Sequence, residues 1–368
     1  MSEIVLDGHK LLWHQDRVEA WLRGERIAPI TIDCALTRRC DYRCTYCYAT
    51  LQANDEKRMT REVIFRFLDD AAEIGVKAIS LVSDGESVCS PYVYDAILRG
   101  RSNGLDIALG TNGHLLRDDR LEDILPALTY LRYNFSAGEP DRYAQIHGCK
   151  VESYDKVLNT IRQSVRIKRE KSLSVTIGLQ MVLLPQFEDQ IMPLARLGGD
   201  LGVDYLVIKH CSDDEQGSLG VDYSKYQGMV STLKRAEELT TPAYLVRAKW
   251  SKILSGGKRG YRQCYGPPFI MQFSGSGLVA PCGMLFNKRY KKKYHIGNIV
   301  ETPFKALWKS ERYWEVINLI ASDKFDAQTM CGSLCLQHKA NEFLWDLKQG
   351  RPKLAEPSTA PPMHINFV

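Results

Sequence analysis

The chain has 368 residues, of which 44% are hydrophobic and 25% charged, as in a folded globular protein of more than one domain. The formal net charge of +5 is small for this length and does not suggest nucleic acid as a partner. The first residues lack the apolar core of a signal peptide, and the longest apolar stretch, 175–185, is too short and interrupted to cross a bilayer. We therefore expect a cytoplasmic protein with no membrane or nucleic-acid partner.

Apolar runs alternate with amphipathic segments from residue 31 to about residue 210. The segment 60–75 has apolar residues at helical spacing, a threonine that can cap its start and a glycine that can end it. Further helices are expected near 90–104, 153–170 and 188–200, and strands at 31–36, 78–82, 106–110, 131–136, 175–183 and 205–209. This alternation predicts a parallel α/β sheet, either open or closed into a partial (β/α)6 barrel.

The unusual polar residues of the chain follow these predicted strands. In parallel α/β folds the chemistry lies beyond the carboxyl ends of the strands, so we expect these residues to face one cavity. They are three cysteines after the first strand, "SDGES" (83–87) after the second, "TNG" (111–113) after the third, "NFSAGEP" (134–140) at the fourth, Gln180 late in the fifth and "KHCSDDE" (209–215) at the sixth.

Three of the eleven cysteines, Cys40, Cys44 and Cys47, stand in "CDYRCTYC" with the spacing C-x3-C-x2-C. In a reducing compartment such thiols are metal ligands more often than disulfides. A structural zinc ion needs four protein ligands, and no second pair lies nearby. A [4Fe–4S] cluster held by three thiolates keeps one iron open, which suits the binding of a small reactive molecule.

The triplet, with the aromatic Tyr46 before its third cysteine, resembles the radical S-adenosylmethionine (SAM) enzymes. "SDGES" is similar to the Gly-Gly-Glu-Pro motif of that family, although Asp84 and Ser87 replace its first glycine and its proline. "LGTNG" and "NFSAGEPDRYAQIHG" resemble the third- and fourth-strand segments, although the usual aspartate of the fourth is missing. The resemblance implies SAM contacts by Glu86 to the methionine amino group, by the Gly85 backbone and by Ser136 to the ribose, with Tyr46, Asn112 and Gln180 beside them.

This resemblance also implies a mechanism. One [4Fe–4S] cluster, reduced by a partner such as flavodoxin or ferredoxin, cleaves SAM to a 5′-deoxyadenosyl radical that takes a hydrogen atom from a substrate. The protein positions the reactants and excludes water and oxygen.

A second cysteine group comprises Cys264, Cys282, Cys331 and Cys335, with Cys282 in a Gly-x4-Cys segment that starts at Gly277. This region resembles the SPASM and twitch domains that follow many radical SAM barrels, although a complete SPASM pattern has seven cysteines. The resemblance implies one fully ligated auxiliary [4Fe–4S] cluster. A zinc site made by the same four thiolates fits the long gap between Cys264 and Cys282 poorly.

These patterns divide the chain into four parts: an N-terminal cap segment (1–30), a radical SAM partial barrel (31–239), a smaller SPASM/twitch-like α+β domain (240–347) and a proline-rich tail (348–368). The segment 14–30 is a candidate lid over the barrel. We expect the tail to lie extended on the surface.

Two reactions compete for a small, carbohydrate- or cyclitol-like substrate. Dehydrogenation uses the auxiliary cluster as an electron acceptor and needs a base, for which Lys209 and His210 are candidates, and either residue could instead bind a substrate anion. Closely similar cysteine spacing occurs in twitch-bearing dehydrogenases of amino-sugar-like cyclitols, which favours this reading. Epimerisation needs a hydrogen-atom donor, for which Cys211 is the candidate.

Two further readings are less favoured. Peptide maturation is one, because only about 30 residues precede the first predicted strand, fewer than the peptide-binding domain common in such enzymes. A non-catalytic zinc or iron–sulfur module is the other, because the open-iron triplet occurs together with the Glu86 motif.

Overall fold

The computed structural model describes residues 3–333, 335–351, 354–355 and 357–368. A single sheet runs through both domains in the order β10-β9-β8-β1-β2-β3-β4-β5-β6-β7. The strands from β8 to β7 are parallel, and β9 and β10 add two antiparallel pairings at one edge. The strands are β1 Thr31–Cys34, β2 Ala78–Leu81, β3 Asp106–Thr111, β4 Tyr130–Asn134, β5 Thr176–Leu183, β6 Tyr205–His210, β7 Leu245–Ala248, β8 Ile270–Phe273, β9 Leu278–Ala280 and β10 Gly297–Asn298.

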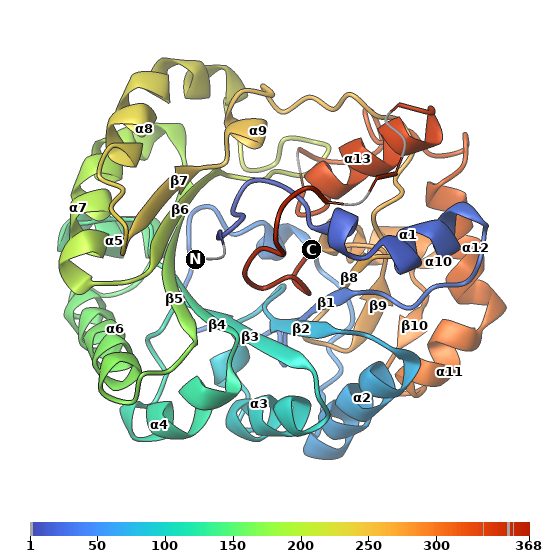
Figure 1. Ribbon diagram of the computed structural model, residues 1–368, viewed down its shortest axis with the longest axis horizontal. Helices are drawn as coiled ribbons and strands as arrows, with labels where there is room; N and C mark the ends of the chain where they lie inside the picture. Colours follow the sequence, from blue (N-terminus) through green and yellow to red (C-terminus); the bar gives the residue numbers. More distant parts are fainter. Residues whose placement is uncertain (1–2, 334, 352–353, 356) are drawn as a thin grey trace.

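Helices cover the outer face of the curved sheet (Figure 1). The helices of the chain are α1 Gln15–Leu22, α2 Arg61–Ile74, α3 Val93–Ser102, α4 Leu121–Ile124, α5 Pro140–His147, α6 Glu152–Glu170, α7 Ile191–Leu201, α8 Val230–Glu237, α9 Trp250–Ile253, α10 Lys291–Tyr294, α11 Phe304–Lys309, α12 Glu311–Ile320 and α13 His338–Lys348. Of these, α9 lies beside β7 and does not belong to the outer layer (Figure 1). The Thr60 side chain accepts the N–H of Val63 at the start of α2, and Gly75, with φ of 98°, ends that helix. The partial barrel and its helices agree with the sequence prediction.

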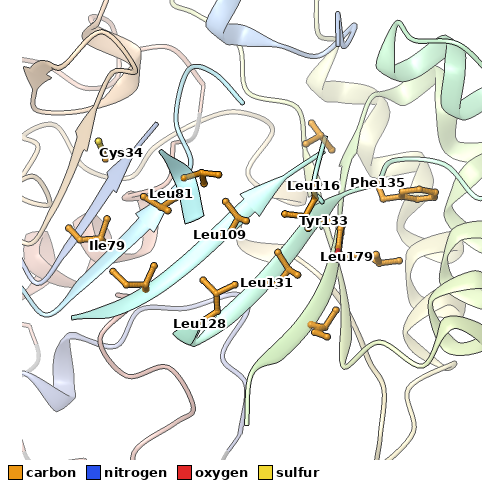
Figure 2. Packing of buried hydrophobic residues seen from close by; sticks show 14 of the residues in the cluster. Cys34, Ile79, Leu81, Leu109, Leu116, Leu128, Leu131, Tyr133, Phe135 and Leu179 are labelled. Carbon is orange, nitrogen blue, oxygen red and sulfur yellow. The ribbon is translucent and has the colours of Figure 1, made fainter. Parts of the chain in front are cut away.

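Alternate residues along each strand separate the two faces of the sheet. Figure 2 shows Leu81, Leu109, Leu131, Tyr133 and Leu179 packed in the core between the strands and the outer helices. The residues between them, such as Arg132 on β4 and Lys209 on β6, are half-buried and point to the inner side. The inner side of the sheet is therefore polar, as expected where a site is built.

The sheet extends beyond the six predicted strands at both edges. At one edge β7 pairs in parallel with β6, although Leu245–Ala248 follows the predicted boundary at residue 239. At the other edge β8 pairs in parallel with β1, so a strand of the second domain continues the barrel sheet. Neither pairing is visible in the sequence, because both strands have only four residues and no clear alternation.

The C-terminal tail is exposed at residues 358–361, as expected, but its last residues, 362–368, are buried or half-buried. Its last residues reach the amino end of the parallel strands, near the centre of the view in Figure 1. Three tail contacts fall on the first residue of a strand: Thr31 Oγ1 donates to the carbonyl of Asn366 at 2.6 Å, His364 Nε2 meets Thr176 Oγ1 at 2.7 Å, and Phe367 packs edge-on against Tyr130. The tail therefore closes the end of the barrel opposite the loop that carries Cys40, Cys44 and Cys47, which we call the cysteine loop.

The N-terminal segment closes the same region. Lys10 Nζ donates to the carbonyls of His364 and Phe367, both at 2.9 Å, and His14 Nε2 lies 3.0 Å from that of Ile365. Val18 of α1 packs with α13 in a separate apolar cluster. The segment 14–30 thus packs against the tail and α13 and does not lie over the carboxyl ends of the strands. No helix among the described residues is long and apolar enough to span a membrane.

Candidate active site

The cysteine loop is fixed by the end of α5. The N–H groups of Arg43 and Thr45 donate to the carbonyls of His147 and Ile146, at 3.1 and 2.9 Å. Gly148, with φ of 57°, ends α5 so close to the loop that a Cβ would lie 2.3 Å from the Arg43 carbonyl oxygen. Only glycine fits both the backbone conformation and this approach.

Glu86 joins the loop after β2 to the loop after β3. Its carboxylate accepts the N–H of Asn112 at 2.8 Å, the hydroxyl of Thr111 at 2.9 Å and the N–H of Val88 at 3.1 Å. Burial raises the pKa of Glu86 to about 7, although these three donors favour the charged form. The side chain thus organises the predicted SAM site in addition to any contact with SAM.

Gly85 brings the loop after β2 against the loop after β1. A Cβ at Gly85 would lie 2.0 Å from the Thr37 carbonyl oxygen, so no other residue fits without moving the backbone. Asp84, which replaces the first glycine of the motif, is buried and accepts from Ser274 Oγ at 2.6 Å and the Gly275 N–H at 2.8 Å. The departure from the motif therefore ties the barrel to the segment that follows β8.

The Asn112 side chain reaches the cysteine loop. Its amide donates to Asp41 Oδ1 at 2.8 Å, and His114 Nδ1 contacts Asp41 Oδ2 at 2.7 Å. Asp41 lies between Cys40 and Cys44 in the sequence, so the loop after β3 holds the first cysteine in place. The sequence did not predict this second role of Asn112.

Ser136, Tyr46 and Gln180 also lie at the carboxyl ends of the strands. The Ser136 N–H donates to His147 Nε2 at 3.0 Å, and the Tyr46 hydroxyl lies 3.4 Å from Nδ1 of the same ring. Gln180 Nε2 donates to Asn134 Oδ1 at 2.9 Å on the inner side of the sheet. The structure thus gathers the predicted SAM-contacting residues at one end of the barrel beside the cysteine loop.

Cys40 is exposed, and Cys44 and Cys47 are half-buried. Partial burial of the thiol, together with the nearby Glu86, Asp41 and Cys47, raises the pKa of Cys40 to about 12. Burial also raises the pKa of Cys44, and the charge of Cys47 adds to this increase. The three thiols are thus close enough to interact. If they ligate a metal centre, the metal replaces the proton on each sulfur.

The four cysteines of the second domain gather in one cluster. Cys282 lies in an apolar group against which Cys264, Cys331 and Cys335 pack. Burial raises the pKa of Cys282, and the charges of these three thiols raise it further. Four thiols so placed suit an iron–sulfur cluster whose iron atoms are all held by protein.

Arg259 holds the loop that carries Cys331 and Cys335. It is 8% exposed and donates to the carbonyls of Gly332, Ser333 and Ala327, while its Nη2 lies 3.5 Å from Cys331 Sγ. Burial opposes its charge, but Cys331 and Cys335 hold its pKa above the usual value. The sequence analysis missed Arg259, which carries no motif.

The three candidate catalytic residues do not share one face of β6. Lys209 points to the inner side, whereas His210 is fully buried against Tyr223 and Tyr226 on the other side. Burial lowers the pKa of His210 to about 3, so its ring is neutral, and its Nδ1 donates to the carbonyl of Cys211 at 2.7 Å. This position argues against His210 as a base, because the imidazole does not face the inner side.

Cys211 lies beside the cysteine loop. Its Sγ donates to the carbonyl of Tyr46 at 3.7 Å, and its backbone N–H to the Tyr226 hydroxyl at 3.1 Å. Burial raises its pKa to about 12, so the thiol keeps its hydrogen.

Across the described residues, no group of three or more His, Cys, Asp or Glu side chains is placed to hold a single metal ion.

Comparisons with known proteins agree with this site. A model of the radical SAM superfamily matches residues 35–197, and one of an iron–sulfur cluster-binding domain matches 264–335. A tungsten-containing aldehyde ferredoxin oxidoreductase cofactor-modifying protein of Pyrococcus furiosus is 23% identical over 294 residues, which cover 76% of this chain and 80% of the relative. An AdoMet-dependent heme synthase of Methanosarcina barkeri is 24% identical over 304 residues, 77% of this chain and 83% of the relative.

Two solved structures share the fold. Streptococcus suis SuiB bound to S-adenosylmethionine superposes with a TM-score of 0.64 at 14% identity, over 94% of this chain and 82% of that one. The structure described as native anSMEcpe with bound AdoMet and Cp18Cys peptide gives a TM-score of 0.59 at 16% identity, over 89% and 98%. At this identity the likeness concerns the fold alone. The two family models show that the chain carries a radical SAM domain followed by a SPASM iron–sulfur domain, with SAM and iron–sulfur clusters as its cofactors.

Proposed function

We propose that this chain is a radical SAM oxidoreductase that dehydrogenates a small, carbohydrate- or cyclitol-like substrate, with flavodoxin or ferredoxin as reductant. The observation that carries the proposal is the gathering of four thiols in the second domain. Because four thiolates complete the ligation of one [4Fe–4S] cluster, that cluster exchanges electrons and does not bind substrate.

In this proposal Cys40, Cys44 and Cys47 hold the SAM-binding cluster, and Cys264, Cys282, Cys331 and Cys335 hold the auxiliary one. When bound, SAM and the two clusters supply a radical that takes one hydrogen atom from the substrate and a centre that takes the remaining electron after a proton leaves. The protein residues position the substrate and accept that proton. The product is two hydrogens lighter than the substrate.

Lys209 is the proposed proton acceptor. Burial lowers its pKa well below the usual value, and Lys252, Arg132 and Lys249 lower it further. A lysine held neutral in this way can take a proton from a substrate hydroxyl near neutral pH. Lys209 also lies two residues before Cys211, whose sulfur contacts the cysteine loop, so it stands near the predicted SAM site.

A second candidate function is epimerisation, which one observation favours. The Cys211 thiol keeps its hydrogen and lies against the cysteine loop. A thiol in that state can return a hydrogen atom to a substrate radical, which leaves the substrate's mass unchanged. The two reactions thus differ in the mass of the product.

The test is anaerobic reconstitution, screening of polyhydroxylated substrates with 5′-deoxyadenosine as readout, and mass spectrometry of the product in deuterated water. A product lighter by two hydrogens supports dehydrogenation. A product of unchanged mass that carries one solvent deuterium would replace it by epimerisation. Stoichiometric zinc without labile sulfide in the purified protein would contradict both.

A further inference from the structure

Four basic side chains, from Arg132, Lys209, Lys249 and Lys252, gather on the inner side of the sheet, and we call them the cationic cluster. Lys209 is held neutral as the proposed proton acceptor, and the other three carry the positive charge. The Lys249 N–H donates to the carbonyl of Ile208 at 2.8 Å, which places Lys249 beside Lys209. The Lys252 N–H donates to the carbonyl of Lys249 at 2.9 Å, one turn further on. Arg132 comes from β4 and points to the same side as Lys209.

These cations repel one another. The pKa of Lys209 is lowered by burial and then by Lys252, Arg132 and Lys249, and that of Lys252 is lowered to about 7 by burial and then by Lys249. The pKa of Lys249 is also lowered, by burial and by Arg132. The pKa of Lys209 thus responds to all three other side chains, that of Lys252 to Lys249 and that of Lys249 to Arg132, which agrees with the positions given by the backbone contacts.

Within the described residues, no carboxylate forms an ion pair with any member of the cationic cluster. Lys252 is 8% exposed, and the Arg132 Nε atom is buried without a hydrogen-bond partner. The nearest carboxylates are Asp33, beside Arg132 and Lys209, and Asp7, which accepts instead from the N–H of Ser251 at 2.9 Å and from its hydroxyl. Asp33 and Asp7 thus make no ion pair with Arg132, Lys249 or Lys252 among the described residues.

The cationic cluster lies between the two groups of cysteines. On one side Lys209 is next to the strand end where Cys211 Sγ contacts the Tyr46 carbonyl in the cysteine loop, at 3.7 Å. On the other side the charge of Lys252 interacts with Cys335 of the second domain. A substrate that meets both cofactors has to lie in this region.

Unpaired buried cations are costly, and a fold retains them when a ligand supplies the opposite charge. We infer that the cationic cluster binds an anionic group of the substrate, a carboxylate or a phosphate, and orients the substrate between the two cysteine groups. This inference rests on the proposed function, because that reaction requires a substrate between the two groups of cysteines. It adds that the substrate is an anion, which the proposed function leaves open.

The test titrates the anaerobically reconstituted protein, saturated with SAM, with pyrophosphate or with succinate, and follows the melting temperature at constant ionic strength. We expect either anion to stabilise the wild-type protein more than chloride does. Lys252→Met and Lys249→Met should each weaken that binding about tenfold to hundredfold, the range for one charge-assisted hydrogen bond. Lys234→Met, on the exposed face of α8, is the matched control and should bind as the wild type does.

Without anion, Lys252→Met should melt at the same temperature as the wild type or higher, because the substitution removes a buried unpaired charge. The relative response to pyrophosphate and to succinate distinguishes a phosphate from a carboxylate. Equal stabilisation of all variants would mean surface screening and would overturn the inference. The inference would also be overturned if Lys252→Met lowered the melting temperature without anion but bound the anion as tightly as the wild type.

A third measurement, of SAM affinity, tests whether the cationic cluster binds the carboxylate of SAM and not an anionic group of the substrate. If the cationic cluster serves that carboxylate, Lys252→Met weakens SAM binding by the same factor, and SAM abolishes the binding of added anion. That pattern would overturn the inference. The titrations need no turnover, so their outcome is independent of whether the product is oxidised or epimerised.

Discussion

The imidazole of His147 connects the fourth strand to a predicted cluster ligand, with Nδ1 3.4 Å from Cys44 Sγ. Because Nε2 accepts the Ser136 N–H at 3.0 Å, the ring hydrogen of the neutral imidazole lies on Nδ1. Burial lowers the pKa of His147 to about 3, which agrees with a neutral ring. His147 therefore directs a hydrogen-bond donor at the sulfur of Cys44, a contact that tunes the cluster when it is bound.

We predict that His147→Gln lowers the reduction potential of the SAM-binding cluster. Glutamine can keep an acceptor for Ser136 but has no donor at the position of Nδ1. Loss of one hydrogen bond of about 1 kcal/mol corresponds to about 40 mV for one electron. The measurement is a redox titration followed by electron paramagnetic resonance.

His147→Asn is the matched control, because its amide nitrogen can stand where Nδ1 stands. It should keep most of the wild-type potential and lose the Ser136 contact instead. If His147→Gln and His147→Asn shift the potential equally, the ring acts only by packing against Tyr46 and Tyr143.

Glu86 carries a pH-dependent prediction. Its pKa is raised to about 7, mainly by burial, so the carboxylate gains its charge as the pH rises through that value. If it contacts the SAM ammonium group, SAM affinity should rise between about pH 6 and about pH 8. The dissociation constant of SAM, measured across this range on protein with intact clusters, checks the direction.

Glu86→Gln should remove the pH dependence and weaken SAM binding by about 1.5–3 kcal/mol at pH 8, with the iron content unchanged. The amide keeps the shape of the side chain and one acceptor oxygen for the N–H of Asn112 or Val88. An unchanged SAM affinity in this variant would assign Glu86 solely to the hydrogen bonds that join the two loops.

The alternation of strands and helices in the barrel could be predicted from the sequence. Apolar runs such as Thr176–Leu183 are long, and parallel strands bring their carboxyl ends together, so the motifs after them had to meet. Spacing also predicted Cys40, Cys44 and Cys47 as ligands, because iron–sulfur ligands often occur in short local patterns. The widely separated Cys264, Cys282, Cys331 and Cys335 were predicted from the resemblance.

The remaining features depend on contacts between distant segments. The tail was expected on the surface because it is rich in proline, yet Asn366 Nδ2 donates to Asp106 Oδ2 at 2.8 Å, 260 residues away. The cationic cluster was invisible for the same reason, since Arg132 and Lys252 lie far apart in the chain and belong to no motif. His147 stood inside a recognised segment, but its function depends on the tautomer that the Ser136 N–H selects.

Arg259→Lys should detach the auxiliary cluster selectively. Lysine keeps the charge but cannot donate at once to the carbonyls of Gly332 and Ser333, which then lose buried partners at about 1–3 kcal/mol each. We expect the iron content to fall from about eight to about four per chain. SAM should still be cleaved to 5′-deoxyadenosine. Loss of all iron would mean that the substitution unfolds the chain.

The last prediction concerns Cys211, whose thiol keeps its hydrogen beside the cysteine loop. For dehydrogenation, Cys211→Ala should keep most of the turnover, because the electron leaves through the second domain and no hydrogen atom returns to the substrate. Removing the thiol leaves a small cavity at about 1 kcal/mol, so the variant should still fold. Cys211→Ser is the companion variant, since its hydroxyl can replace the hydrogen bond to Tyr46 but does not donate a hydrogen atom to a carbon radical. Turnover in both variants, measured by product mass, supports dehydrogenation. If both still form 5′-deoxyadenosine but no product, and the wild-type product carries solvent deuterium, Cys211 is the donor of an epimerase.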